Sequence, residues 1–208
     1  MSRNLKAALG AATVLTLGAC ASTSFNTTWK APGAQPLSLK SGDKVVAMVV
    51  SPNEATRRGC EAALAAELSK RGLQGVPAYS IIPTSEIKDK DKAKARIEAA
   101  GAVAVVVMRA TGTEQQVSAS SPMYASPYYG GFWGGYYGWG WGTVYSPGYL
   151  RTDTIVHIET LVYDLKQDKL VWAGQSQTTN PSQAESLIRE LVDEAAKEMK
   201  KQGVIGRT

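Results

Sequence analysis

Few side chains in this sequence have the type and spacing that catalysis needs. His157, the only histidine, stands two residues before Glu159, so in an extended segment both side chains lie on one face. A histidine beside a carboxylate can act in acid–base catalysis. Arg109 ends an apolar run and is expected to pair with Glu159 or Asp153 across a sheet. Because no nucleophile stands at a recognisable spacing and no GxSxG, HExxH, Walker A or CxxC motif is present, we interpret these residues as structural and expect no enzyme.

Cys20 has the most specific chemistry in the chain. It follows a short segment with two basic residues, an apolar stretch over 7–17 and small residues at its end, which is typical of a signal peptide. The segment resembles a bacterial lipobox, in which the cysteine is acylated and becomes the new N-terminus. The alternative is a signal peptide without lipid, with Cys20 incidental. We predict a signal peptide over 1–19 and attachment to membrane lipid through acylated Cys20, since two or three acyl chains anchor a protein stably.

The residue after Cys20 and the charge of the remaining chain indicate where the protein is located and which partners are excluded. Ala21 stands where aspartate retains such lipoproteins at the inner membrane, so in a Gram-negative host we expect an outer-membrane protein that faces the periplasm. Without residues 1–19 the chain has 21 Lys and Arg and 18 Asp and Glu. This excess of positive charge is too small to indicate a nucleic-acid partner. With Cys20 lipidated, Cys60 has no disulfide partner within the chain, and we expect a buried, inert thiol there. We expect no metal and no cofactor.

The most unusual segment is an insertion over 115–150, which contains no charged residue. Residues 123–149 hold 11 of the 16 aromatic residues and eight glycines, and this glycine density disfavours a long helix or strand. A loop of this length in a compact domain is usually functional or disordered. If it binds something, the expected anchors are aromatic side chains at Phe132, Trp133, Tyr136, Tyr137, Trp139 and Trp141.

Three interpretations of the insertion compete. It could be a poorly ordered low-complexity loop whose aromatic residues partly cover the sheet edge. It could be an adhesive surface for an envelope protein or for further copies of the chain, because aromatic residues are enriched at interfaces. It could also contact lipid headgroups or glycans, which tyrosine and tryptophan favour. In each case we expect that deleting 123–149 would leave the fold nearly intact.

The rest of the sequence must form the scaffold. Apolar runs predict three parallel strands, with helices between them, and alternating segments predict an antiparallel C-terminal hairpin. A final helix is expected from a capping box at Ser182 and Glu185. The predicted strands cover 44–50, 76–82, 102–108, 152–163 and 169–177. We therefore expect a lipidated tether over 20–42 and one α/β domain over 43–205, with a mixed sheet of about five strands covered by three helices.

Several segments resemble an uncharacterised bacterial lipoprotein family with a Tyr/Gly/Trp-rich insertion. They are TTWKAPGA (27–34), RRGCEAALAAEL (57–68), AVAVVVMR (102–109) and TDTIVHIETLVYDLKQDKLVWAGQSQTTNPS (152–182). This resemblance implies a location and no established activity. The order of elements is also similar to the α/β domain of the curli secretion lipoprotein and to the N-terminal domain of the Tol translocation protein, which are binding and assembly modules.

Together these observations predict a non-catalytic, lipid-anchored binding or assembly module of the bacterial envelope, with the aromatic insertion as its interaction surface. The alternative is a glycan-binding module or an enzyme of unrecognised class, with its chemistry around His157 and Glu159.

Overall fold

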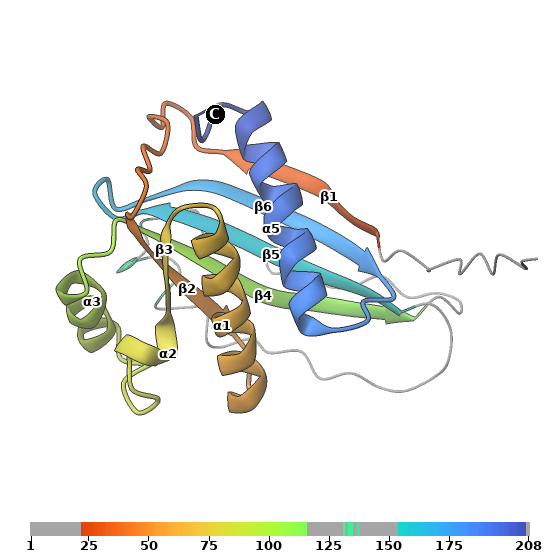
Figure 1. The fold of residues 1–208 in the computed structure, drawn as a ribbon, viewed down its shortest axis with the longest axis horizontal. Helices are drawn as coiled ribbons and strands as arrows, with labels where there is room; N and C mark the ends of the chain where they lie inside the picture. Colours follow the sequence, from red (N-terminus) through yellow and green to blue (C-terminus); the bar gives the residue numbers. More distant parts are fainter. Residues whose placement is uncertain (1–21, 116–130, 132, 135–136, 138–153, 207–208) are drawn as a thin grey trace, which may run out of the picture.

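The structure is a computed structural model, and it describes residues 22–115, 131, 133–134, 137 and 154–206. The expected signal peptide and Cys20 lie outside these residues. The described elements, in chain order, are β1 (Ser22–Lys30), β2 (Lys44–Val50), α1 (Glu54–Lys70), β3 (Gln74–Pro77), α2 (Ala78–Ile81), α3 (Lys90–Ala99), β4 (Ala104–Gln115), β5 (Thr154–Asp164), β6 (Lys169–Thr179) and α5 (Ala184–Lys201) (Figure 1).

The strands form one mixed sheet in the order β1-β6-β5-β4-β2-β3. Strand β2 is parallel to both β3 and β4, and the other neighbouring strands are antiparallel. The expected α/β class is therefore confirmed, with three parallel strands and a C-terminal hairpin. The described part has six strands and four helices, one more of each than expected.

The tether expected over 20–42 is corrected by the structure. Ser22–Lys30 forms β1, which pairs antiparallel with β6 at one edge of the sheet. The ring of Phe25 meets Trp172 edge-on, with 5.3 Å between centroids, and Leu37 is buried in a bridge to Ile205. These contacts tie the segment to the domain, so that only Ala21 separates Cys20 from β1.

The strand expected over 76–82 is also shorter than the sequence indicated. β3 ends at Pro77, and the short helix α2 follows. Proline lacks an amide hydrogen for a strand ladder and suits a helix start. The amide of Tyr79 donates to the buried carboxylate of Glu61 at 2.7 Å, which holds the start of α2 against α1.

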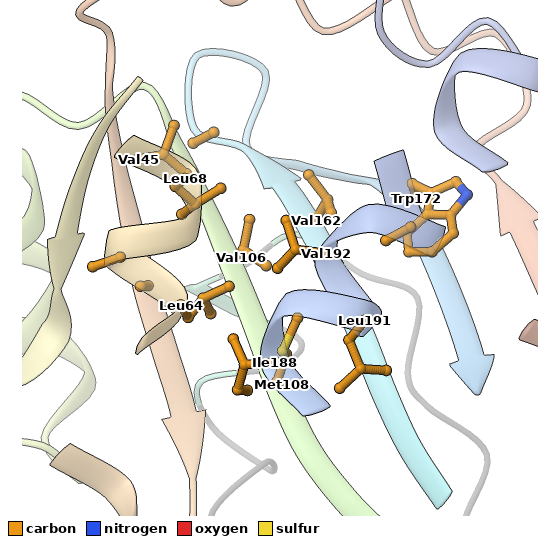
Figure 2. Packing of buried hydrophobic residues seen from close by; sticks show 14 of the residues in the cluster. Val45, Leu64, Leu68, Val106, Met108, Val162, Trp172, Ile188, Leu191 and Val192 are labelled. Carbon is orange, nitrogen blue, oxygen red and sulfur yellow. The ribbon is translucent and has the colours of Figure 1, made fainter. Parts of the chain in front are cut away.

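Each face of the sheet has its own hydrophobic core. On the first face, α1 and α5 pack against the sheet through residues such as Leu64 and Leu191 (Figure 2). On the second face, α2 and α3 cover the parallel strands, and Trp133 and Tyr137 of the insertion join this core. The aromatic insertion therefore contributes to the packing of the second face.

Four strands reach the same end of the sheet. Ser22 of β1 pairs with Thr179 of β6, which pairs with Ile155 of β5, which in turn pairs with Glu114 of β4. This row lies on the right in Figure 1, and the turn between β5 and β6 lies at the opposite end. We call the row the near end, because it begins at Ser22, close to Cys20 in the sequence, and we call the turn over 165–168 the far turn. Within the described residues, no helix is long and apolar enough to span a membrane.

Candidate functional site

The ion pair expected across the sheet is present. Arg109 of β4 lies opposite Glu159 of β5, and the Arg109 Nε donates to the Glu159 Oε2 at 2.5 Å. Glu159 is 2% exposed, so its carboxylate depends on the guanidinium to offset the cost of losing water. Both side chains lie on the second face of the sheet. Tyr163, which is on β5 like Glu159, is buried on this face, and burial raises the pKa of its phenol.

His157 lies on the same face as Glu159, as the alternation predicted, but its partner is a different residue. A bulge in β4 between Ala110 and Gly112 shifts the register, so that His157 pairs with Gly112. The His157 Nε2 is 3.5 Å from the Glu114 Oε1, and it makes no hydrogen bond within the described part of the chain. The structure thus places Arg109, Glu159, His157 and Glu114 on one face, as an Arg109–Glu159 ion pair and a separate His157–Glu114 contact.

Two of the six expected anchor residues are buried. Trp133 is 7% exposed and Tyr137 is 2% exposed, and their rings lie 6.0 Å apart. The Tyr137 hydroxyl donates to the Ile87 carbonyl at 2.7 Å, and burial raises the pKa of this phenol. The ammonium of Lys94 on α3 lies 5.5 Å from the centre of the Trp133 ring, which is within cation–π range.

The backbone of Gly131, in the same part of the insertion, packs closely against the far turn. A Cβ built on Gly131 would lie 2.8 Å from the backbone oxygen of Asp168, so glycine permits this close approach. Through Gly131, Trp133 and Tyr137, the insertion joins α3 to the sheet. Two expectations are corrected: these two aromatic side chains are not exposed anchors, and deleting 123–149 would remove part of the second core.

Phe132, Tyr136, Trp139 and Trp141 lie outside the described residues, as does Cys20. The free thiol of Cys60 is half-buried on α1. Burial raises its pKa, and the neighbouring carboxylates of Glu185 and Glu61 raise it further, which disfavours a reactive thiolate.

A buried charge network at the start of α1 was not recognised from the sequence. Arg57 is 2% exposed and bridges Glu54 and Glu61, and Glu61 is fully buried. Glu61 also accepts from the amides of Val49 and Tyr79, and burial raises its pKa. Because these partners tie α1 to β2 and α2, we interpret the network as structural. The Arg57–Glu61 spacing of four residues, typical of a helical ion pair, was the available signal.

Glu54, the outer member of the network, has the opposite shift. Its pKa falls from 4.5 to about 2, mainly because its carboxylate accepts from the Thr84 hydroxyl and then from Arg58 and Arg57. No group of three or more His, Cys, Asp or Glu side chains in the described ranges is arranged to hold a metal ion.

Comparison with known proteins identifies a family without an assigned activity. Residues 43–198 match the sequence model of the family described as "Domain of unknown function (DUF4136)". None of the curated proteins matches the chain.

Solved structures similar to the chain include two PelC dodecamers from Paraburkholderia phytofirmans, one of them a variant with a single substitution. Each is 12% identical, has a TM-score of 0.44 and is covered over 100% of its length, while 90% and 91% of this chain are covered.

Proposed function

The chain belongs to the DUF4136 family, whose description names no activity, and we propose that it is a lipid-anchored, non-catalytic binding or assembly module of the bacterial envelope. In this proposal Cys20 is acylated, the domain faces the periplasm from the outer membrane, and the aromatic insertion contacts a protein partner or further copies of the chain.

The observation that carries this proposal is the fixed position of the middle of the insertion. Tyr137 is held by its hydrogen bond to Ile87 and by the second core, and Trp133 packs beside it. Trp139 and Trp141 follow Tyr137 by two and four residues in the sequence. A docked segment also loses less conformational entropy on binding than a free loop would.

The test of acylation uses the two cysteines of the chain as a matched pair. We expect Cys20→Ser to abolish the added acyl mass and membrane fractionation, whereas Cys60→Ser should retain both. Intact-mass spectrometry of protein from a bacterial envelope measures this directly. Wild-type protein that keeps Met1 and carries no lipid would refute the proposal.

The test of the interaction places a photoreactive phenylalanine analogue at Trp139. We expect irradiation of intact cells to give a discrete protein adduct from this position. The control position is Lys197 on α5, whose side chain is 69% exposed, and it should give no such adduct. Equal adducts from both positions, or none from Trp139, would contradict an interaction surface in the insertion.

The alternative function is a glycan-binding module or an enzyme, and the gathering of Arg109, Glu159 and His157 on one face favours it. Two variants separate the proposals in a strain with a phenotype for loss of the gene. Loss of function in His157→Ala, together with normal function in the Trp139→Ala, Trp141→Ala double variant, would favour the alternative.

A further inference from the structure

We propose that the near end of the sheet rests on the lipid headgroups, while the far turn stands clear of the bilayer. This inference rests on the proposed acylation of Cys20. It adds an orientation that acylation alone does not give, because a long flexible tether would leave the domain free to turn.

The reach of the chain limits where the near end can be. Only Ala21 lies between Cys20 and the first residue of β1. Two Cα–Cα steps span at most about 7 Å. Ser22 is in register with Thr179, and Thr179 with Ile155, so the ends of β1, β6 and β5 lie at the same level along the strand direction. Figure 1 shows this shared end of the sheet.

The chemistry of the near end suits a headgroup surface. The connection from β6 to α5, residues 180–183, has the sequence NPSQ and contains no charge. Its side chains at Asn180, Ser182 and Gln183 are exposed and can hydrogen-bond to water or headgroups. The first charge beyond it is Glu185, in the first turn of α5. This uncharged polar connection can approach anionic lipids without electrostatic repulsion, and the one acidic residue of the row, Glu114, lies on β4, three strands away from Ser22.

The far turn differs in both position and charge. The ten residue steps from Thr179 back to Lys169 correspond to about 33 Å of strand. The turn and its flank expose Lys166, Asp168 and Lys169 to solvent. Since Gly131 packs against Asp168, the buried part of the insertion is also at this end. Trp133 and Tyr137 are then too far from the bilayer to act as interfacial aromatic residues.

Depth-dependent quenching tests this orientation on the lipidated full-length protein. Single cysteines replace Gln183 near the bilayer or Lys166 at the far turn, in a Cys60→Ala background, and each is labelled with a small fluorophore. The proteins are reconstituted into phosphatidylethanolamine–phosphatidylglycerol vesicles with nitroxide-labelled headgroups. We expect the probe at 183 to lose most of its fluorescence and the probe at 166 to lose almost none.

A linker variant provides the matched control. About twelve Gly and Ser residues inserted between Ala21 and Ser22 add a mean span of about 19 Å. This longer linker should abolish quenching of the probe at position 183, while the protein still floats with the vesicles. Equal quenching at both positions, quenching at 166 alone, or none at either would overturn the orientation. Absence of acyl mass and of vesicle flotation would instead refute the proposed function, and this inference with it.

Discussion

Replacing Trp133 with alanine tests whether the insertion is part of the core. The side chain is 7% exposed and packs in the second core beside Tyr137. Truncating a buried tryptophan typically costs about 3–5 kcal/mol. Loss of the cation–π contact with Lys94 adds about 0.5–1 kcal/mol. We therefore expect Trp133→Ala to lower the free energy of unfolding by about 4 kcal/mol, a large share of the roughly 5–15 kcal/mol of a typical domain.

Urea denaturation of a soluble form beginning at residue 21 measures this change. In a domain of this size, 4 kcal/mol corresponds to a decrease in Tm of about 8–16 °C. Trp133→Phe is the matched control, because it retains most of the apolar contact and should cost less than half as much. Trp133→Ala with stability within about 0.5 kcal/mol of wild type, the range of neutral surface substitutions, would refute the assignment of Trp133 to the core.

Three further predictions concern the described contacts. Tyr137→Phe should lower the free energy of unfolding by about 1–2 kcal/mol in urea titrations, because the buried carbonyl of Ile87 loses its donor. Since the pKa of Glu54 is about 2 in the folded protein and 4.5 ordinarily, its carboxylate stabilises the fold above about pH 4.5, and this stabilisation is lost as the pH falls toward 2. Glu54→Gln should therefore flatten the acid limb of a stability–pH curve, and an unchanged limb would contradict this. Gly75→Ala should lower the free energy of unfolding by about 3 kcal/mol, because its Cβ would lie 2.0 Å from a backbone oxygen of α1. Gly59→Ala, in open space on α1, should instead raise the free energy of unfolding by about 0.5–1 kcal/mol. Thermal melting of both variants measures the difference.

The buried strands were predictable because burial on two faces leaves a continuous apolar run. The segment KVVAMVV is an example, and it forms β2 from Lys44 to Val50. The edge strand β1, with the sequence STSFNTTWK, was not recognised because only one of its edges pairs and Ser24, Asn26 and Thr27 are exposed. Its strand conformation depends on pairing with β6, nearly 150 residues away in sequence, which local periodicity does not reveal.

Capping-box patterns at Ser51 and Glu54 and at Ser182 and Glu185 predict the starts of two helices, but other residues occupy the caps in the structure. α1 is capped by Asn53, whose side chain accepts from the Thr56 amide. Ser51 was the expected cap, and its hydroxyl accepts from the Asn53 amide instead. Ser182 also lies outside the cap of α5, where Gln183 occupies the position without a side-chain bond. Several polar residues compete within one turn, and tertiary contacts decide between them.

Of the two residue pairs across β4 and β5, the sequence predicted one and missed the other. The Arg109–Glu159 pair follows from strand alternation, because both residues stand at predictable positions on neighbouring strands. The His157–Glu114 contact depends on the bulge between Ala110 and Gly112, which shifts the register by one residue. A backbone irregularity of this kind leaves little trace in residue type.

The insertion shows why composition alone misassigned two aromatic residues. Its glycine content argued against helix, since each glycine costs about 1 kcal/mol relative to alanine. The backbone is nevertheless helical at Trp133, Gly134 and Tyr137, and the spacing of four residues places both aromatic rings on one side. Burying two aromatic side chains of about 150–250 Å² each, at about 25 cal/mol per Å², contributes about 8–12 kcal/mol, which exceeds the cost of a few glycines. Folding and binding are therefore separable by mutation: Trp133→Ala should lower stability, whereas Trp141→Ala should weaken the photoadduct formed from position 139 without changing the unfolding midpoint.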